Sequence, residues 1–246
     1  MRRLRKGTYS KSLTCSLIAA PLNPGYKESE AHFYLGDTDA KLLILPKGSL
    51  RGEGVSGGAL AAKRAAESLN IRIVEAVLDA ANATVTLVDA QGPLPKGEPT
   101  GASEDQTALI LHTSGTTGRP KAVPLSHKNL VATMHNIQRT YKLTQEDKTY
   151  LVMPLFHVHG LMCGLLSSLL SGGTVVIPPR FSASAFWDEV TKSRPTWYTA
   201  VPTIHQIVLT LEQPSSIPPF RFIRSCSSSL SPSTFEKLEN ALGAPV

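Results

Sequence analysis

The chain has 246 residues, and 41% of them are hydrophobic, which is sufficient for the buried core of one large domain or two small ones. The formal net charge is +6, but five of the cationic side chains lie in the first eleven residues: Arg2, Arg3, Arg5, Lys6 and Lys11. Because the rest of the chain is nearly balanced in charge and has no basic stripe, the composition argues against nucleic-acid binding.

Cysteine use and hydropathy restrict the class of protein further. Cys15, Cys163 and Cys226 are scattered along the chain and form no Cys-x-x-Cys pair. This pattern favours a reducing compartment and argues against a disulfide framework. The apolar stretch 160–173 is too short for a transmembrane helix, which takes about 20 apolar residues. We therefore expect a buried helix there and no membrane span.

The first half of the chain alternates between predicted helices and predicted strands. Helices are expected over residues 29–40 and 57–70, and strands over 41–46, 84–90 and 107–113. Residues 91–106 are rich in Gly, Pro and acidic side chains, which predicts a surface loop or linker.

The second half continues this alternation. Predicted strands cover residues 150–155, 174–179, 196–202 and 220–226, and predicted helices cover 126–143, 160–170, 182–193, 203–213 and 231–243. Ser126 and Pro232 are typical of helix N-termini, and Gly243 is typical of a helix C-terminus. Short apolar strands separated by helices predict an α/β fold, in which parallel sheets are flanked by helices. If the alternation of helices and strands continues, Val246 begins a further strand, so we interpret the chain as the leading part of a longer protein.

The segment HTSGTTGRPK, residues 112–121, carries four hydroxyl side chains and two glycines directly after a predicted strand. The N–H groups and hydroxyls of such a loop can surround an anion, and Lys121 adds a positive charge. We therefore expect a polyphosphate-binding loop. It is not a Walker A loop, because Pro120 replaces the second glycine and Ala122 replaces the Ser or Thr that holds magnesium.

The longer stretch TSGTTGRPKAVPLSH, residues 113–127, closely resembles the signature loop of the adenylate-forming superfamily. That superfamily includes acyl-CoA synthetases, coumarate–CoA ligases, luciferases and the adenylation domains of peptide synthetases. Ala122 departs from the glycine that most members carry. AAPLNPGY, MPLFHVHG and RFIRSCSSSL are similar to three further segments of these enzymes.

The resemblance begins near residue 19 and sets the expected domain boundaries. Residues 1–18 are interpreted as a non-matching extension, either a targeting peptide or an artefact of the gene model. Residues 19–246 are interpreted as a partial AMP-binding N-terminal domain that stops before the C-terminal lid domain of the family.

The resemblance implies a two-step ligase that uses ATP, Mg²⁺ and coenzyme A. A carboxylic acid attacks the α-phosphate of ATP to give an acyl-adenylate and pyrophosphate, and the thiol of coenzyme A then displaces AMP. The residues implied to bind the β- and γ-phosphates are Thr113, Ser114, Gly115, Thr116, Thr117 and Lys121. No catalytic residue is assigned, because the family's magnesium-binding acid, ribose-binding aspartate and lid lysine have no counterpart here, and we expect the fragment alone to be inactive.

Three stretches, LFHVHGL, TWYTAVPTIHQI and FRFIRSCSSSL, together resemble the oxalate–CoA ligase group of fungi and plants. Where relatives that take apolar acids have small apolar residues, this chain has Cys226 followed by Ser227, Ser228 and Ser229. These hydroxyls, with His157 as a further donor, suit a small dicarboxylate, whose second carboxylate must be hydrogen-bonded when buried. The resemblance implies oxalate as the favoured acid and a cytoplasmic or peroxisomal location.

Two other functions stay open at this point. The substrate could be another short-chain or aromatic acid, or the chain could be an inactive nucleotide-binding fragment. His157 and His159 would share one face of a strand, but no Asp, Glu or Cys lies near enough in sequence to complete a zinc site, so no metal site is predicted. His159 could equally be a structural partner.

Several neighbouring residues have simpler expected roles. Trp197, Tyr198 and His205 are expected to pack in the core, and Cys226 is expected to be a small buried side chain rather than a nucleophile. Ser229 and Ser231 are expected to cap the helix that follows them.

Overall fold

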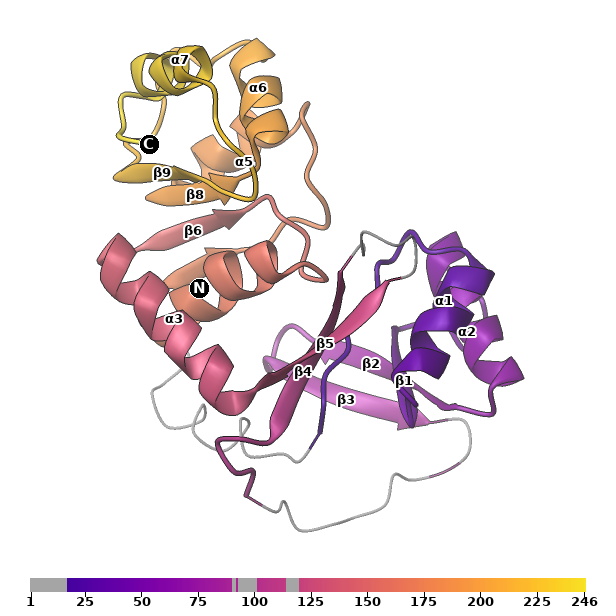
Figure 1. Cartoon of the computed structure of the whole chain (residues 1–246). Helices are drawn as coiled ribbons and strands as arrows, with labels where there is room; N and C mark the ends of the chain where they lie inside the picture. The colour runs from indigo at the N-terminus through magenta and orange to yellow at the C-terminus, as the bar shows by residue number, and fades with distance from the viewer. Residues whose placement is uncertain (1–16, 90–91, 93–100, 114–119) are drawn as a thin grey trace. The chain divides into compact units, whose positions relative to one another are not determined.

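The computed structural model describes residues 17–89, 92, 101–113 and 120–246. The chain forms two compact units, Met1–Ser126 and His127–Val246, and each contains strands covered by helices (Figure 1). The expected α/β fold is confirmed, with a parallel sheet and flanking helices in the second unit. No helix in these described ranges has the length and apolar character needed to cross a membrane.

The first unit contains a three-stranded sheet covered by two helices. Its elements are α1 (Glu28–Asp37), β1 (Leu42–Pro46), α2 (Gly57–Ser68), β2 (Arg72–Asp79), β3 (Thr84–Asp89), β4 (Thr107–Thr113) and β5 (Lys121–Ser126). The sheet has the order β1-β2-β3, with β2 parallel to β1 and antiparallel to β3. Helix α2 buries a row of alanines against α1 and β1, and Ser56 caps its start by accepting a hydrogen bond from the Ala59 N–H at 3.2 Å.

Strands β4 and β5 form a separate antiparallel pair in this unit. His112, next to the end of β4, lies 3.0 Å from the Asp37 carboxylate through its Nε2 and packs edge-on against the Tyr34 ring, with 4.6 Å between the ring centroids. These contacts join the end of β4 to α1. In register, Thr113 of β4 lies opposite Lys121 of β5.

The second unit is a doubly covered parallel sheet. Its elements are α3 (His127–Tyr141), β6 (Lys148–Leu151), the π-helix η1 (His159–Leu166), α4 (Ser167–Leu170), β7 (Thr174–Val176), α5 (Phe186–Ser193), β8 (Trp197–Ala200), α6 (Pro202–Thr210), β9 (Phe222–Ser225) and α7 (Pro232–Leu242). The strand order is β7-β6-β8-β9, and all three pairings are parallel.

Alternation along the strands divides the core of this unit between the two faces of the sheet. Tyr198 and Ile223 point into the large cluster with α5, α6 and α7, whereas Trp197 and Phe222 point to the face covered by α3. Figure 1 shows α3 on one side of β6 and α6 and α7 beyond β8 and β9. Trp197 and Tyr198 are both fully buried, which confirms the expectation that they pack.

The segment after β6 is a π-helix rather than the simple helix that the sequence predicts over 160–170. A Cβ on Gly160 would lie 2.3 Å from the Pro154 carbonyl oxygen, so only glycine fits this close approach. The Ser167 hydroxyl donates to the Met162 carbonyl, five residues earlier, at 2.6 Å. Such wide turns often lie at functional sites.

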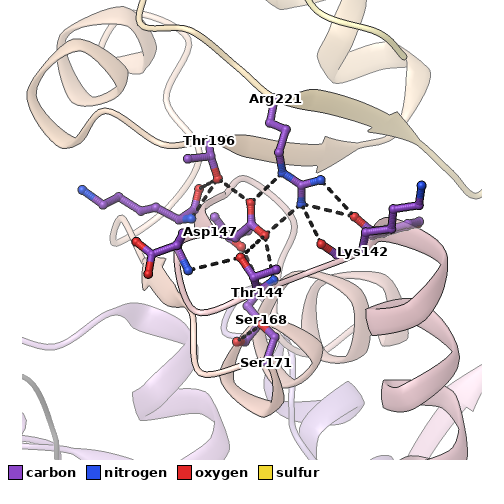
Figure 2. A network of polar contacts seen from close by, with 11 residues as sticks. Lys142, Thr144, Asp147, Ser168, Ser171, Thr196 and Arg221 are labelled. Carbon is purple, nitrogen blue, oxygen red and sulfur yellow. Dashed lines mark hydrogen bonds and ion pairs between the residues drawn. The ribbon is translucent and has the colours of Figure 1, made fainter.

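A network of polar contacts around Asp147 ties the start of β6 to the starts of β8 and β9 (Figure 2). Arg221 donates from Nε to Oδ1 at 2.9 Å and from Nη2 to Oδ2 at 2.8 Å. The Thr196 hydroxyl and the Thr144 N–H donate to the same carboxylate at 3.0 and 2.8 Å. Arg221 also donates to the Tyr141 carbonyl at the end of α3. The network therefore fixes the end of α3 against the end of the sheet at which β6, β8 and β9 begin.

Most predicted elements are confirmed, with their ends shifted by a few residues. Helix α7 begins at Pro232 after the N-cap Ser231, and Gly243 ends it in the left-handed conformation at φ 62°, as expected. Two strands were not predicted, β2 and β5. The pairings of β3 with β2 and of β5 with β4 are antiparallel, so parallel pairing does not extend to every strand.

Candidate functional site

The order of the second sheet creates a topological switch point between β6 and β8. The chain leaves β6 to form β7 on one side and then crosses back to form β8 on the other side. The connection after β6 enters η1 and α4, which pack with α3, whereas β8 leads into α6, which belongs to the opposite core cluster. Open parallel sheets bind ligands in the crevice outside the carboxyl ends of the strands at such a point. The carboxyl end of this sheet, between β6 and β8, is therefore the candidate site of the second unit.

Three polar side chains from three neighbouring segments meet at the carboxyl end of the sheet. His159 is the first residue of η1, Thr199 lies near the carboxyl end of β8, and Ser227 follows β9. Nε2 of His159 lies 2.7 Å from the Thr199 hydroxyl, and Nδ1 lies 3.2 Å from the Ser227 hydroxyl. His159 and Thr199 are 4% and 2% exposed, whereas Ser227 is exposed. The line of hydrogen bonds therefore runs from the buried sheet to the surface.

Burial lowers the pKa of His159 below its usual value, which favours the neutral ring. A neutral imidazole offers one donor and one acceptor, so it can connect two hydroxyl groups but cannot donate to both. The arrangement can thus hold an exposed hydroxyl in one orientation beside a ligand.

The three serines expected to line the acid site all lie at this carboxyl end. Ser227, Ser228 and Ser229 are exposed, and Ser227 has a positive φ of 75°, a conformation that non-glycine residues rarely adopt. Ser231 caps α7 by accepting from the Thr234 N–H at 3.2 Å, which confirms its expected role. Backbone strain such as that at Ser227 is found at binding sites, where surrounding contacts maintain it.

His157, the other residue expected at the acid site, is placed differently from His159. β6 ends at Leu151, so the two histidines do not alternate along a strand, and His157 is exposed while His159 is buried. The His157 ring packs against Phe156 with 4.6 Å between centroids. Ser227 contacts His159 instead of His157. The sequence analysis had left a structural role open for His159.

His205 is a satisfied core histidine, as expected. It is fully buried, its Nδ1 lies 3.1 Å from the Tyr198 hydroxyl, and its Nε2 lies 3.2 Å from the Arg224 carbonyl. Burial lowers its pKa to about 4, although hydrogen bonds with backbone groups act in the opposite direction.

Cys226 is partly buried beside Ser227. The other free cysteine of the second unit, Cys163, has a pKa raised to about 11 by burial and by the neighbouring Cys226, so it is not an activated thiol.

The expected phosphate-binding loop lies mostly outside the described residues. Ser114, Gly115, Thr116 and Thr117 belong to that part of the chain. The two ends of the loop are described: Thr113 and Lys121 are exposed and face one another as partners in the β4–β5 register. The hairpin thus presents a hydroxyl and an ammonium group side by side at the ends of the connection.

The described part of the chain contains no group of three His, Cys, Asp or Glu side chains placed to hold a metal ion. Thr199 is the site residue that the sequence did not reveal. Its only signal was a polar residue inside an otherwise apolar strand, two positions after the buried Trp197 and therefore on the same face.

Comparisons with known proteins identify the chain's relatives. It is 47% identical over 235 residues to an oxalate–CoA ligase of Arabidopsis thaliana. This alignment covers 93% of this chain and 44% of the relative. An oxalate–CoA ligase of Saccharomyces cerevisiae is 43% identical, with 93% of this chain and 45% of the relative covered. Among solved structures, ATP-bound MatB from Rhodopseudomonas palustris is 25% identical with a TM-score of 0.71, covering 93% of this chain and 43% of that one.

The chain therefore spans less than half the length of these relatives. Residues 12–246 match the family described as AMP-binding enzyme, which is nearly the whole chain. On this match and on the two relatives above 40% identity, the chain belongs to the AMP-binding enzyme family.

Proposed function

We propose that the protein carrying this chain is an ATP-dependent acid–CoA ligase whose preferred acid is oxalate. One observation supports the choice of acid: Ser227, His159 and Thr199 form a polar line at the carboxyl end of the parallel sheet. An apolar acid would leave the outward proton of the Ser227 hydroxyl without an acceptor, whereas a small dicarboxylate needs hydrogen bonds for its second carboxylate. The relatives named oxalate–CoA ligases support the same choice.

The reaction has two steps. A carboxylate oxygen of the acid attacks the α-phosphorus of ATP, an acyl–phosphate bond forms, and pyrophosphate leaves. The sulfur of coenzyme A then attacks the acyl carbon, a thioester forms, and AMP leaves with the electron pair of the broken carbon–oxygen bond. In both steps the protein must hold anionic groups close together, which requires donors and cations placed before the reaction begins.

The β4–β5 hairpin of the first unit is the proposed phosphate-binding segment. Lys121 would place its ammonium group beside the β- and γ-phosphates, and the Thr113 hydroxyl would donate to them. Ser114, Gly115, Thr116 and Thr117 would complete the loop. Mg²⁺ would accompany the phosphates and supply further positive charge.

The carboxyl end of the second sheet is the proposed acid-binding site. Ser227 would donate its hydroxyl proton to the distal carboxylate of oxalate, and the exposed imidazole of His157 would supply a second donor. Ser228 and Ser229 are exposed beside Ser227 and would add hydroxyls to the same wall.

We place the enzyme in the cytosol or the peroxisome, which imaging of the tagged full-length protein would test.

The test is thioester formation by the full-length protein with ATP, coenzyme A and a panel of acids: oxalate, malonate, acetate, octanoate and benzoate. We expect the highest kcat/KM with oxalate. A preference for benzoate or octanoate would overturn the choice of acid and leave the ligase activity standing. If no acid on the panel supports ATP–pyrophosphate exchange, the ligase proposal itself is wrong.

A further inference from the structure

The direction of the hydrogen bonds through His159 decides what Ser227 can do. Two directions satisfy the distances. In the first, the Thr199 hydroxyl donates to Nε2, and the proton on Nδ1 is donated to the Ser227 oxygen. In the second, the proton is on Nε2 and is donated to Thr199, and the Ser227 hydroxyl donates to Nδ1. Only the first leaves the Ser227 proton available to a ligand.

Thr199 favours the first direction because its hydroxyl proton has few places to go. The side chain is 2% exposed, so water does not reach it freely. Within residues 120–246, all of which are described, the one hydrogen-bond partner of this hydroxyl is Nε2 of His159. In the second direction Thr199 would accept a proton and its own proton would be buried without an acceptor, which is costly.

Two further features agree with a fixed direction. Burial of His159 favours the neutral ring, and a charged ring would donate from both nitrogens and erase the distinction. Ser227 is exposed and has a φ of 75°, so its hydroxyl proton can reach solvent or a ligand while its oxygen accepts from the ring.

We infer that Thr199 is a positioning residue for anion binding. Its hydroxyl donates to Nε2 of His159, holds the ring proton on Nδ1, and thereby turns Ser227 into a donor toward a carboxylate at the carboxyl end of the sheet. This inference deepens the proposed function and rests on it only for the identity of the anion, since the direction of the hydrogen bonds is a property of the protein alone.

The direct test is ¹⁵N NMR of the full-length protein with labelled histidine, because protonated and unprotonated ring nitrogens have separate chemical shifts. His159 signals are assigned as those lost in His159→Gln. We expect the wild-type ring to be protonated at Nδ1 and unprotonated at Nε2. Observation of the proton on Nε2 would overturn the inference without any variant of Thr199 and without any measurement of activity.

Two substitutions of Thr199 extend the test to ligand binding. Thr199→Val keeps the shape and removes the donor, so both ring forms should become populated and the KM for oxalate should rise roughly tenfold or more, as expected when a donor to a charged group is lost. Thr199→Ser restores the hydroxyl and should restore the wild-type ring form and KM. If Thr199→Val leaves the ring signals and the KM unchanged, the inference is wrong.

The matched control is Thr149→Val. Thr149 is a fully buried threonine on the neighbouring strand β6, and its hydroxyl bonds Ser168 at 2.7 Å instead of His159. It should disturb packing to a similar degree while leaving the His159 signals and the KM for oxalate unchanged. Should the enzyme prefer a different acid, the proposed function fails, but the wild-type NMR result still decides the role of Thr199.

Discussion

Arg221 and Asp147 form a two-pronged ion pair at the start of the parallel sheet, with Nε 2.9 Å from Oδ1 and Nη2 2.8 Å from Oδ2 (Figure 2). The Asp147 side chain is 5% exposed and the Arg221 side chain 41%. Because the same carboxylate also accepts from Thr144 and Thr196, it is the centre of the contacts that join α3, β6, β8 and β9.

We predict that Asp147→Asn destabilises the full-length protein by about 1.5–3 kcal/mol, the range for losing hydrogen bonds to a charged group. The substitution keeps the size of the side chain but removes the charge that Arg221 faces. Urea unfolding followed by tryptophan fluorescence measures the shift, since Trp197 lies in this unit. Asp39→Asn is the control: its ion pair with Lys41 is 84% and 79% exposed, so its unfolding midpoint should not change.

The same pair predicts an acid-dependent loss of stability. Burial raises the pKa of Asp147, but hydrogen bonds from Arg221, Thr144 and Thr196 outweigh it and lower the pKa below its usual value. A carboxyl group with a depressed folded pKa stabilises fully above its unfolded pKa, about 3.9, and loses that contribution as pH falls toward the folded value. The acid limb of the stability curve should be steeper in wild type than in Asp147→Asn, and equal slopes would contradict the assignment.

His205 predicts a second pH effect in a higher range. Burial lowers its pKa from 6.5 to about 4, so below pH 6.5 the unfolded chain binds a proton that the folded protein does not. Stability is therefore greatest above pH 6.5 and falls as pH approaches 4, by as much as about 3 kcal/mol from this group. His205→Gln removes the titration, so its urea midpoint should change less between pH 7 and pH 5. A wild-type slope in the variant would exclude His205 as the cause.

The sequence predicted most of the second unit because its strands and helices have clear periodicity and clear ends, such as Pro232 and Gly243. It did not predict β5, because Pro124 within that strand argues against pairing, and the antiparallel partner β4 lies across a loop. β2 was also missed, although its apolar residues were visible, because pairing with both β1 and β3 is set by tertiary contacts.

The sequence named most residues of the candidate site but did not predict the hydrogen bonds among them. Ser227 and a histidine were expected to act together, and the segment FHVHG offered two choices. His157 was chosen for the acid site, and a structural role was left open for His159. The π-helix that starts at His159 instead buries that ring against Thr199 and leaves His157 exposed. This arrangement depends on the close approach of Gly160 to Pro154, which no local pattern reveals.

For the proposed phosphate-binding hairpin, we predict that Lys121→Ala slows acid-dependent ATP–pyrophosphate exchange and weakens ATP binding. Loss of a charge-assisted contact with phosphate corresponds to roughly 1.5–3 kcal/mol, or about ten- to hundredfold. Lys47→Ala removes another exposed lysine of the same unit and should exchange at the wild-type rate. Equal rates in Lys121→Ala and wild type would show that the hairpin does not bind the phosphates.

For the proposed acid-binding site of the second unit, we predict that Ser227→Ala and His157→Ala lower kcat/KM for oxalate. If these side chains hold the distal carboxylate, removing one leaves a buried charge short of a donor, which costs about 2–5 kcal/mol. Each 1.36 kcal/mol is a factor of ten, so the expected loss is roughly ten- to several-thousandfold. Acetate has no second carboxylate, so its kcat/KM should fall less or rise.

The ratio of oxalate to acetate activity separates this role from general damage to the protein. Ser182→Ala, which removes an exposed hydroxyl paired with Ser184 in the same unit, should leave the ratio unchanged. Ser227 contacts His159 rather than His157, but both donors are proposed to hold the same carboxylate, so the effects of the two variants on oxalate should not be additive. If wild type prefers oxalate but both variants keep its selectivity, the acid is correct and the donors lie elsewhere. If only Ser227→Ala changes the ratio, the hydrogen-bond line through His159 holds the acid and the exposed His157 does not.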